Sequence, residues 1–222
     1  MFIRAMLLLG CCLYYSCQTS PPPPTSPTQS TDNTTTAVNT WLLKGGESPQ
    51  AGEILPNTTE KEVSNLFGKE NVSQDTIFVA DMEPFIGTSL YKGTANELQI
   101  IWTDAKHEHP EVAITRQKGQ WHSPKGIKVG MTLAELVQLN DGKAIQFSGF
   151  GWDYGGNVTN WNGGALEQEK VMVKLQEGEI SPDLQKLYQS VLGDGVFSSD
   201  IKDIEKLGIT VGEISISLNK PQ

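Results

Sequence analysis

The apolar and polar positions of this chain follow two periods, one typical of helices and one typical of strands. Residues 59–68 and 132–142 place apolar side chains on one helical face, and both segments open with Thr-x-x-Glu and stop at a glycine. In this capping box the threonine side chain and the glutamate side chain each accept a hydrogen bond from the other residue's backbone N–H. We therefore expect two short helices, capped by Thr59 and Thr132.

Runs of alternating or continuous apolar residues follow each helix and predict strands. The first set covers 76–80, 88–91, 98–102 and 111–115, and the second covers 144–150, 157–161, 170–175 and 209–218. Two further helices, at Ser181-Pro182-Asp183 and at 199–207, fall in an insertion at about 176–208. The pattern predicts an α+β fold of two tandem modules. Each module is one helix plus a four-stranded antiparallel sheet, and the second carries the two-helix insertion.

The start of the chain has a different character. One basic residue, Arg4, precedes an apolar run at 5–15, and all three cysteines fall within the first 17 residues. The run is shorter than the roughly 20 residues that span a bilayer, and it is typical of a secretory signal. Residues 18–40 are rich in Pro, Ser and Thr, which predicts an extended tether.

These features divide the chain into four parts. The divisions are a signal peptide at 1–16, a lipidated cysteine with its tether at 17–40, a first module at 41–120 and a second at 121–222. No cysteine follows residue 17, so thiol chemistry and disulfides are excluded from the two modules.

The first 17 residues resemble a bacterial lipoprotein signal of the Bacteroidetes type, with its relaxed recognition sequence. Cys17, after Tyr14-Tyr15-Ser16, is the predicted lipidation site, and Cys11, after Leu8-Leu9-Gly10, is the alternative. A plain secretory signal with unmodified cysteines is a third interpretation. The resemblance implies an outer-membrane protein, held by its lipid and facing the periplasm or the cell surface.

The modules also resemble a known architecture. The opening Gly130-Met131-Thr132-x-x-Glu135-Leu136 and its weaker echo at 57–63 are similar to the tandem modules of the β-lactamase inhibitor protein family and to the SmpA/OmlA lipoproteins. The inhibitor family binds proteins on a concave sheet face, so the resemblance implies a protein-binding surface. This chain departs from that family because each module has one helix and no disulfide.

Residues 145–156, which include several aromatic residues, are the main candidate for such a surface. Strand alternation places Phe150, Trp152 and Tyr154 on the face opposite Ile145, with Trp161 as a further member. A bulge at a glycine would instead return Trp152 to the core, and both interpretations stay open. The change of apolar parity at Gly212 indicates that the chain uses such a bulge elsewhere.

The charge balance argues against two classes of binding partner. The chain has 26 acidic and 17 basic residues, for a net charge of −9, which argues against nucleic acids and anionic membrane surfaces as partners. The His107-Glu108-His109 run lies in a polar turn, and we expect no metal, no cofactor and no catalytic residue. The sequence predicts a non-catalytic envelope lipoprotein that binds or assembles with another envelope protein. The alternative is a glycan-binding or glycan-processing envelope protein that uses the same aromatics.

Overall fold

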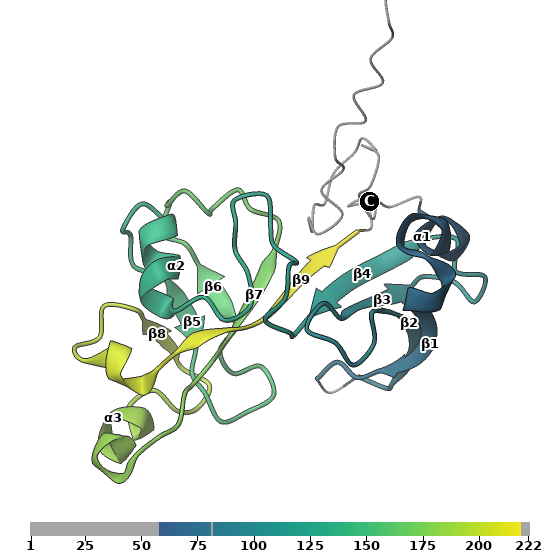
Figure 1. The fold of residues 1–222 in the computed structure, drawn as a ribbon. Coiled ribbons are helices and arrows are strands. Elements are labelled where there is room, and N and C mark those ends of the chain that lie inside the picture. The colour runs from purple at the N-terminus through teal and green to yellow at the C-terminus, as the bar shows by residue number, and fades with distance from the viewer. Residues whose placement is uncertain (1–57, 81, 219–222) are drawn as a thin grey trace, which may run out of the picture. The chain divides into compact units, whose positions relative to one another are not determined.

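Figure 1 shows the computed structural model of the protein, which describes residues 58–80 and 82–218. The predicted α+β class is confirmed. The predicted signal peptide, Cys11, Cys17, the tether and residues 41–57 lie outside the described residues. Within 58–80 and 82–218, no helix has the length and apolar character needed to cross a bilayer.

Both predicted helices form, and each begins with the predicted capping box. Helix α1 spans Glu60–Phe67 and α2 spans Leu133–Leu139, with Thr59 and Thr132 as their caps. At α1 the Glu62 N–H donates to the Thr59 hydroxyl at 3.2 Å, while the Thr59 N–H donates to the Glu62 carboxylate at 2.8 Å. These reciprocal bonds satisfy two backbone donors that would otherwise lack a partner at the helix start.

The strands divide into sheets differently from the prediction. A six-stranded antiparallel sheet has the order β1-β2-β3-β4-β9-β7, and a three-stranded sheet has the order β6-β5-β8. The first contains β1 (Val72–Ile77), β2 (Phe85–Leu90), β3 (Leu98–Trp102), β4 (Pro110–Thr115), β9 (Thr210–Ser217) and β7 (Met172–Gln176). The second contains β6 (Val158–Asn160), β5 (Gln146–Ser148) and β8 (Val196–Ser198).

The difference arises because β9 pairs on both of its edges. It joins β4 from Val112↔Ser217 to Thr115↔Ile214, and its other edge joins β7. In Figure 1, β9 (yellow) runs between these two strands. Strands of both predicted modules therefore share one sheet.

The region predicted as a two-helix insertion is only partly helical. A 3-10 turn at Pro182–Leu184 leads into the short helix α3, Gln185–Gln189. The second predicted helix, at 199–207, is reduced to a 3-10 turn at Ile204–Leu207. The residues just before it include β8, which was not predicted and which pairs with β5.

Apolar residues lie on both faces of the six-stranded sheet. The larger core includes Val63 of α1 and Leu136 of α2. A smaller cluster gathers on Ile77, Ile101 and Ile114, and its members come from β1 to β4 and the segment after β1 rather than from a described helix. Because strand side chains alternate between faces, this smaller cluster marks a second apolar face of the sheet.

Acid is expected to weaken the attachment of β1, one of the two edge strands of the six-stranded sheet. The Asp75 carboxylate accepts from the Lys92 ammonium and the Ser89 hydroxyl, both at 2.6 Å, and these bonds lower its pKa from the ordinary 3.8. A lowered carboxyl pKa adds stability above pH 3.8 that is lost as the pH falls through the folded-state value. Asp75→Asn should cost about 1 kcal/mol at pH 7. Urea titrations should show this difference shrinking below pH 3.8, and a difference that stays constant down to pH 2 would contradict the assignment.

Candidate functional site

A cavity of about 540 Å³ opens on the second apolar face. This volume lies within the range of roughly 300–1,000 Å³ that is usual for pockets that bind small molecules. Its apolar lining consists of Val79, Ala80, Met82, Phe85, Ile101, Val112, Ile114, Tyr154, Val158, Met172 and Val173. Two of these side chains, Met82 and Met172, are 56% and 59% exposed, so apolar surface faces solvent at this site.

Cross-strand pairing explains why these residues meet. Ser215 of β9 lies opposite Ile114 of β4 on one side and Met172 of β7 on the other. Directly opposite residues of antiparallel strands point to the same face, so this row forms part of the cavity lining. The next row places Glu213 opposite Lys174, which brings charged groups to the edge of an apolar floor.

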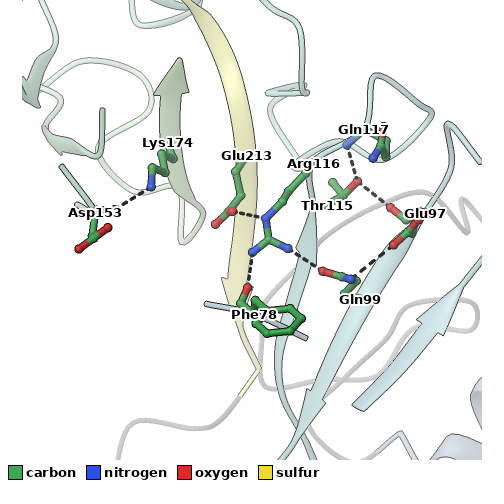
Figure 2. Close-up of polar contacts among 9 residues, drawn as sticks. All are labelled: Phe78, Glu97, Gln99, Thr115, Arg116, Gln117, Asp153, Lys174 and Glu213. Carbon is green, nitrogen blue, oxygen red and sulfur yellow. Dashed lines mark hydrogen bonds and ion pairs between the residues drawn. The ribbon is translucent and has the colours of Figure 1, made fainter. Parts of the chain in front are cut away.

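Arg116 binds Glu213 of this charged row, and it is the only arginine after Arg4 in the sequence. Figure 2 shows its guanidinium donating in three directions. Nε donates to the Glu213 carboxylate at 2.6 Å, Nη1 to the Gln99 side-chain oxygen at 2.6 Å, and Nη2 to the Phe78 backbone oxygen at 3.2 Å. A planar fork suits three fixed acceptors. Arg116 therefore ties β9, β3 and the segment after β1 together beside the cavity.

Arg116→Lys is expected to lower the free energy of unfolding by about 1–2 kcal/mol, because a lysine ammonium cannot match the fork geometry. The figure is modest because the Arg116 and Glu213 side chains are partly exposed, at 35% and 23%. Lys206→Met is the control, since it removes an exposed ion pair to Asp203 within one turn and should cost close to nothing. Equal urea midpoints for the two variants would show that the Arg116 contacts add no stability.

Lys174 lies at the other end of the row. Its ammonium donates to the Asp153 backbone oxygen at 2.8 Å (Figure 2). This bond holds the turn at 151–156 against β7 and brings Tyr154 to the cavity lining. The aromatic segment predicted from the sequence therefore borders the cavity.

Phe150 is not part of any surface. It is 2% exposed, and its ring lies 5.6 Å from that of Phe147 and 6.4 Å from that of Tyr188. Strand β5 ends at Ser148, and the Phe150 N–H then donates to the Val191 backbone oxygen at 2.9 Å. The break in the strand ends the alternation on which the surface prediction relied, so the prediction is wrong for this residue.

Trp152 and Tyr154 do reach the surface, with 41% and 45% of their area exposed. Their rings are 5.4 Å apart at an interplanar angle of 63°, and the Trp152 indole N–H donates to the Gly149 backbone oxygen at 2.8 Å. Trp161 is half-buried and packs against the large core. The structure therefore brings two of the four predicted aromatics together: Tyr154 lines the cavity, and Trp152 packs against the Tyr154 ring. The other two lie in or against the core.

The apolar residues that line the cavity, and Arg116, were not predicted from the sequence. Met172 sits at a polar-facing position of an alternating strand, where an exposed methionine is a weak signal. The isolated arginine was a second available signal. Neither indicates a cavity until β4, β9 and β7 are known to be neighbours.

In the His107-Glu108-His109 run, His107 contacts both an aromatic ring and a carboxylate. The His107 ring stacks on Trp102 with centroids 5.2 Å apart, and its Nδ1 lies 3.0 Å from the Glu60 carboxylate. Across residues 58–80 and 82–218, no group of three or more His, Cys, Asp or Glu side chains is placed to hold a metal ion. The chemistry that the cavity offers is the binding of an apolar group beside fixed charges.

Comparisons with protein-family models, with curated proteins and with solved structures found no match for this chain.

Proposed function

We propose that this protein is a non-catalytic lipoprotein of the cell envelope that binds another envelope protein. Its binding site is the cavity surface, which we define as the cavity together with Met82, Met172, Trp152 and Tyr154. The observation that carries the proposal is the exposed Trp152–Tyr154 pair at the border of an apolar cavity. Aromatic residues that flank an apolar pocket are typical anchors of protein interfaces.

A binding role also fits the charges at the cavity. Glu213 and Arg116 are joined to each other, and Lys174 is bonded to the Asp153 backbone oxygen. Groups fixed by such bonds orient a partner and reject mismatched ones, because a wrong charge placed against them is left unpaired. We therefore infer that Glu213, Arg116 and Lys174 select the partner and do not transfer protons.

The lipid anchor belongs to the same proposal. Acylation at Cys17, or at Cys11 as the alternative, would hold the protein on the outer membrane, and residues 18–40 would space the domain from the lipid surface. At about 3.3–3.6 Å per residue, this tether reaches at most about 80 Å. The cavity surface would then meet partners within that distance of the membrane.

We further propose that the fold keeps the tandem-module plan of the β-lactamase inhibitor protein family. Supporting this, Asn157 forms a bridge with Lys174, and the Leu175 N–H donates to the Gly156 oxygen at 2.8 Å, so β6 also touches β7. Strands β5, β6, β7 and β9 then form a second meander, joined to the first through the β4–β9 pair. The cavity lies across that junction.

Site-specific photo-crosslinking in intact envelopes tests partner binding. A photoreactive residue at position 172 of the full chain should capture one defined protein, while the same residue at position 196 should not. Val196 is the matched control, because it is also an apolar strand residue with 59% exposure but lies outside the cavity lining. Folded Trp152→Ala and Tyr154→Ala variants should reduce the capture. Equal capture at both positions would contradict the proposal.

The glycan alternative is less well supported by the ring geometry. Sugar rings stack on flat aromatic faces, and two rings inclined at 63° do not form a shared platform. A protein side chain that packs against the exposed outer side of the Trp152–Tyr154 pair fits this inclined arrangement better. Binding of the purified protein to envelope glycans, abolished by Trp152→Ala, would favour the alternative.

A further inference from the structure

We propose that, in the free protein, residues Trp41-Leu42-Leu43 of the same chain occupy the cavity. The cavity leaves Met82 and Met172 more than half exposed at its border, and Tyr154 beside them is 45% exposed. Exposed apolar surface around a pocket favours an apolar occupant, because covering it removes that surface from water. Three further observations identify the occupant as a segment of the chain itself.

The first is where the described chain begins. The Glu60 N–H, near the start of the described residues, donates to the His107 backbone oxygen at 3.0 Å, in the turn between β3 and β4. Glu111, four residues after His107, lines the cavity. The described chain therefore begins beside the turn that leads into β4, a strand that lines the cavity.

The second is the length of chain available. Residues 44–57 separate Leu43 from Thr58. Fourteen residues can span up to about 50 Å when extended, which is more than enough to pass around the sheet edge and reach its second face. A linker of this length keeps the effective concentration of its end high near the domain.

The third is the chemistry of the segment. Trp41 is the only aromatic residue in 18–57, and Trp41-Leu42-Leu43 is the longest apolar run there. Lys44 follows directly, and its charge is opposite to that of the Glu111 carboxylate in the cavity lining. The segment therefore offers an apolar group for the cavity and a positive charge for its edge.

Occupancy of the cavity by this segment does not depend on partner binding. Its effect on partner affinity, however, rests on the proposed function. A partner that docks on the cavity surface must displace Trp41 to Leu43. The segment would then act as an internal competitor that lowers partner affinity. Removing it should strengthen capture at position 172.

Photo-crosslinking within the purified full-length protein in detergent tests the occupancy. A benzophenone amino acid at position 41 abstracts hydrogen from nearby C–H bonds and favours methionine. We expect its adducts on Met82 or Met172, at least about tenfold above those from the same group at position 35, which corresponds to a free-energy preference of about 1.4 kcal/mol. Mass spectrometry of the digested monomer identifies the adduct sites.

Two variants test whether the adduct on Met82 depends on the apolar character of the cavity. Met172→Lys should reduce the adduct on Met82 by about tenfold, because an apolar segment would then cover a charge. Val196→Lys should leave it unchanged, and circular dichroism confirms that both variants fold. Adducts outside the cavity lining, equal yields from positions 35 and 41, or no intramolecular adduct from position 41 would each overturn the occupancy. The sample contains no partner, so such a failure leaves the partner-binding proposal standing, and a failed capture in envelopes leaves the occupancy standing.

Discussion

Replacing Gly156 with alanine is expected to lower the free energy of unfolding by about 3 kcal/mol or more. Gly156 has φ +80°, a backbone conformation that residues with a Cβ rarely adopt. A Cβ placed there would lie 2.1 Å from the Leu175 backbone oxygen. The methyl group and a rigid strand carbonyl cannot share this space, so the turn would have to move away from β7.

That movement would break two backbone bonds. The Gly156 N–H donates to the Ser148 oxygen at 2.9 Å, and the Gly156 oxygen accepts from the Leu175 N–H at 2.8 Å. The same turn carries Trp152 and Tyr154, so the variant should also weaken partner capture. Equilibrium urea unfolding, followed by circular dichroism, measures the loss of stability.

Gly142→Ala is the matched control for Gly156→Ala. Gly142 has φ +70°, but a Cβ there meets nothing within 4 Å. Its substitution should therefore cost only the backbone strain, about 1 kcal/mol. If both variants lose the same stability, the close approach to Leu175 is relieved by a small shift and has no cost of its own.

Asn140→Ala is expected to cost about 3 kcal/mol, the second large effect. The Asn140 side chain is fully buried and satisfies three backbone groups. Its oxygen accepts from the Leu166 N–H at 3.1 Å, and its amide donates to the Trp161 oxygen at 2.8 Å and the Lys143 oxygen at 3.2 Å. Alanine would leave these three backbone groups buried without this hydrogen-bond partner.

Asn160→Ala provides the comparison for Asn140→Ala. Asn160 is exposed, and its side chain accepts one bond, from the Asn162 N–H at 2.7 Å. Water can replace that bond, so a loss below about 1 kcal/mol is expected. Thermal unfolding of the two variants in parallel should separate them by several degrees. A shared melting temperature would mean that Asn140 is replaced by water without penalty.

Local features of the fold were predictable from the sequence. The capping boxes depend on residues three positions apart, and both form as predicted. Strand β3 has the predicted bounds, Leu98–Trp102, because its apolar run is bordered by polar turns on both sides. The bulge indicated at Gly212 is confirmed as well, since Lys174 pairs with Glu213 and Leu175 with Val211, skipping the glycine.

Features that depend on distant partners were not predictable. The β4–β9 pair joins Thr115 to Ile214, and no local pattern records that match. Phe150 was misplaced for a related reason, because the 188–193 segment ends β5 by accepting the Phe150 N–H. The cavity was missed because its lining comes from six strands, β2, β3, β4, β6, β7 and β9, and from the segments after β1 and before β6. Only the sheet order brings these elements together.

The position of β9 between β4 and β7 in the six-stranded sheet affects how the domain folds. Strand β9 is the last described strand in the chain, yet it separates β4 from β7 in the sheet. When the chain emerges from its N-terminal end, both of those strands keep a free edge until β9 follows, and free edges invite pairing with other chains. Such non-local pairing also makes folding slow. We therefore expect the two halves to gain protease resistance in one late step, and a chain cut short before residue 210 to aggregate rather than to fold in part.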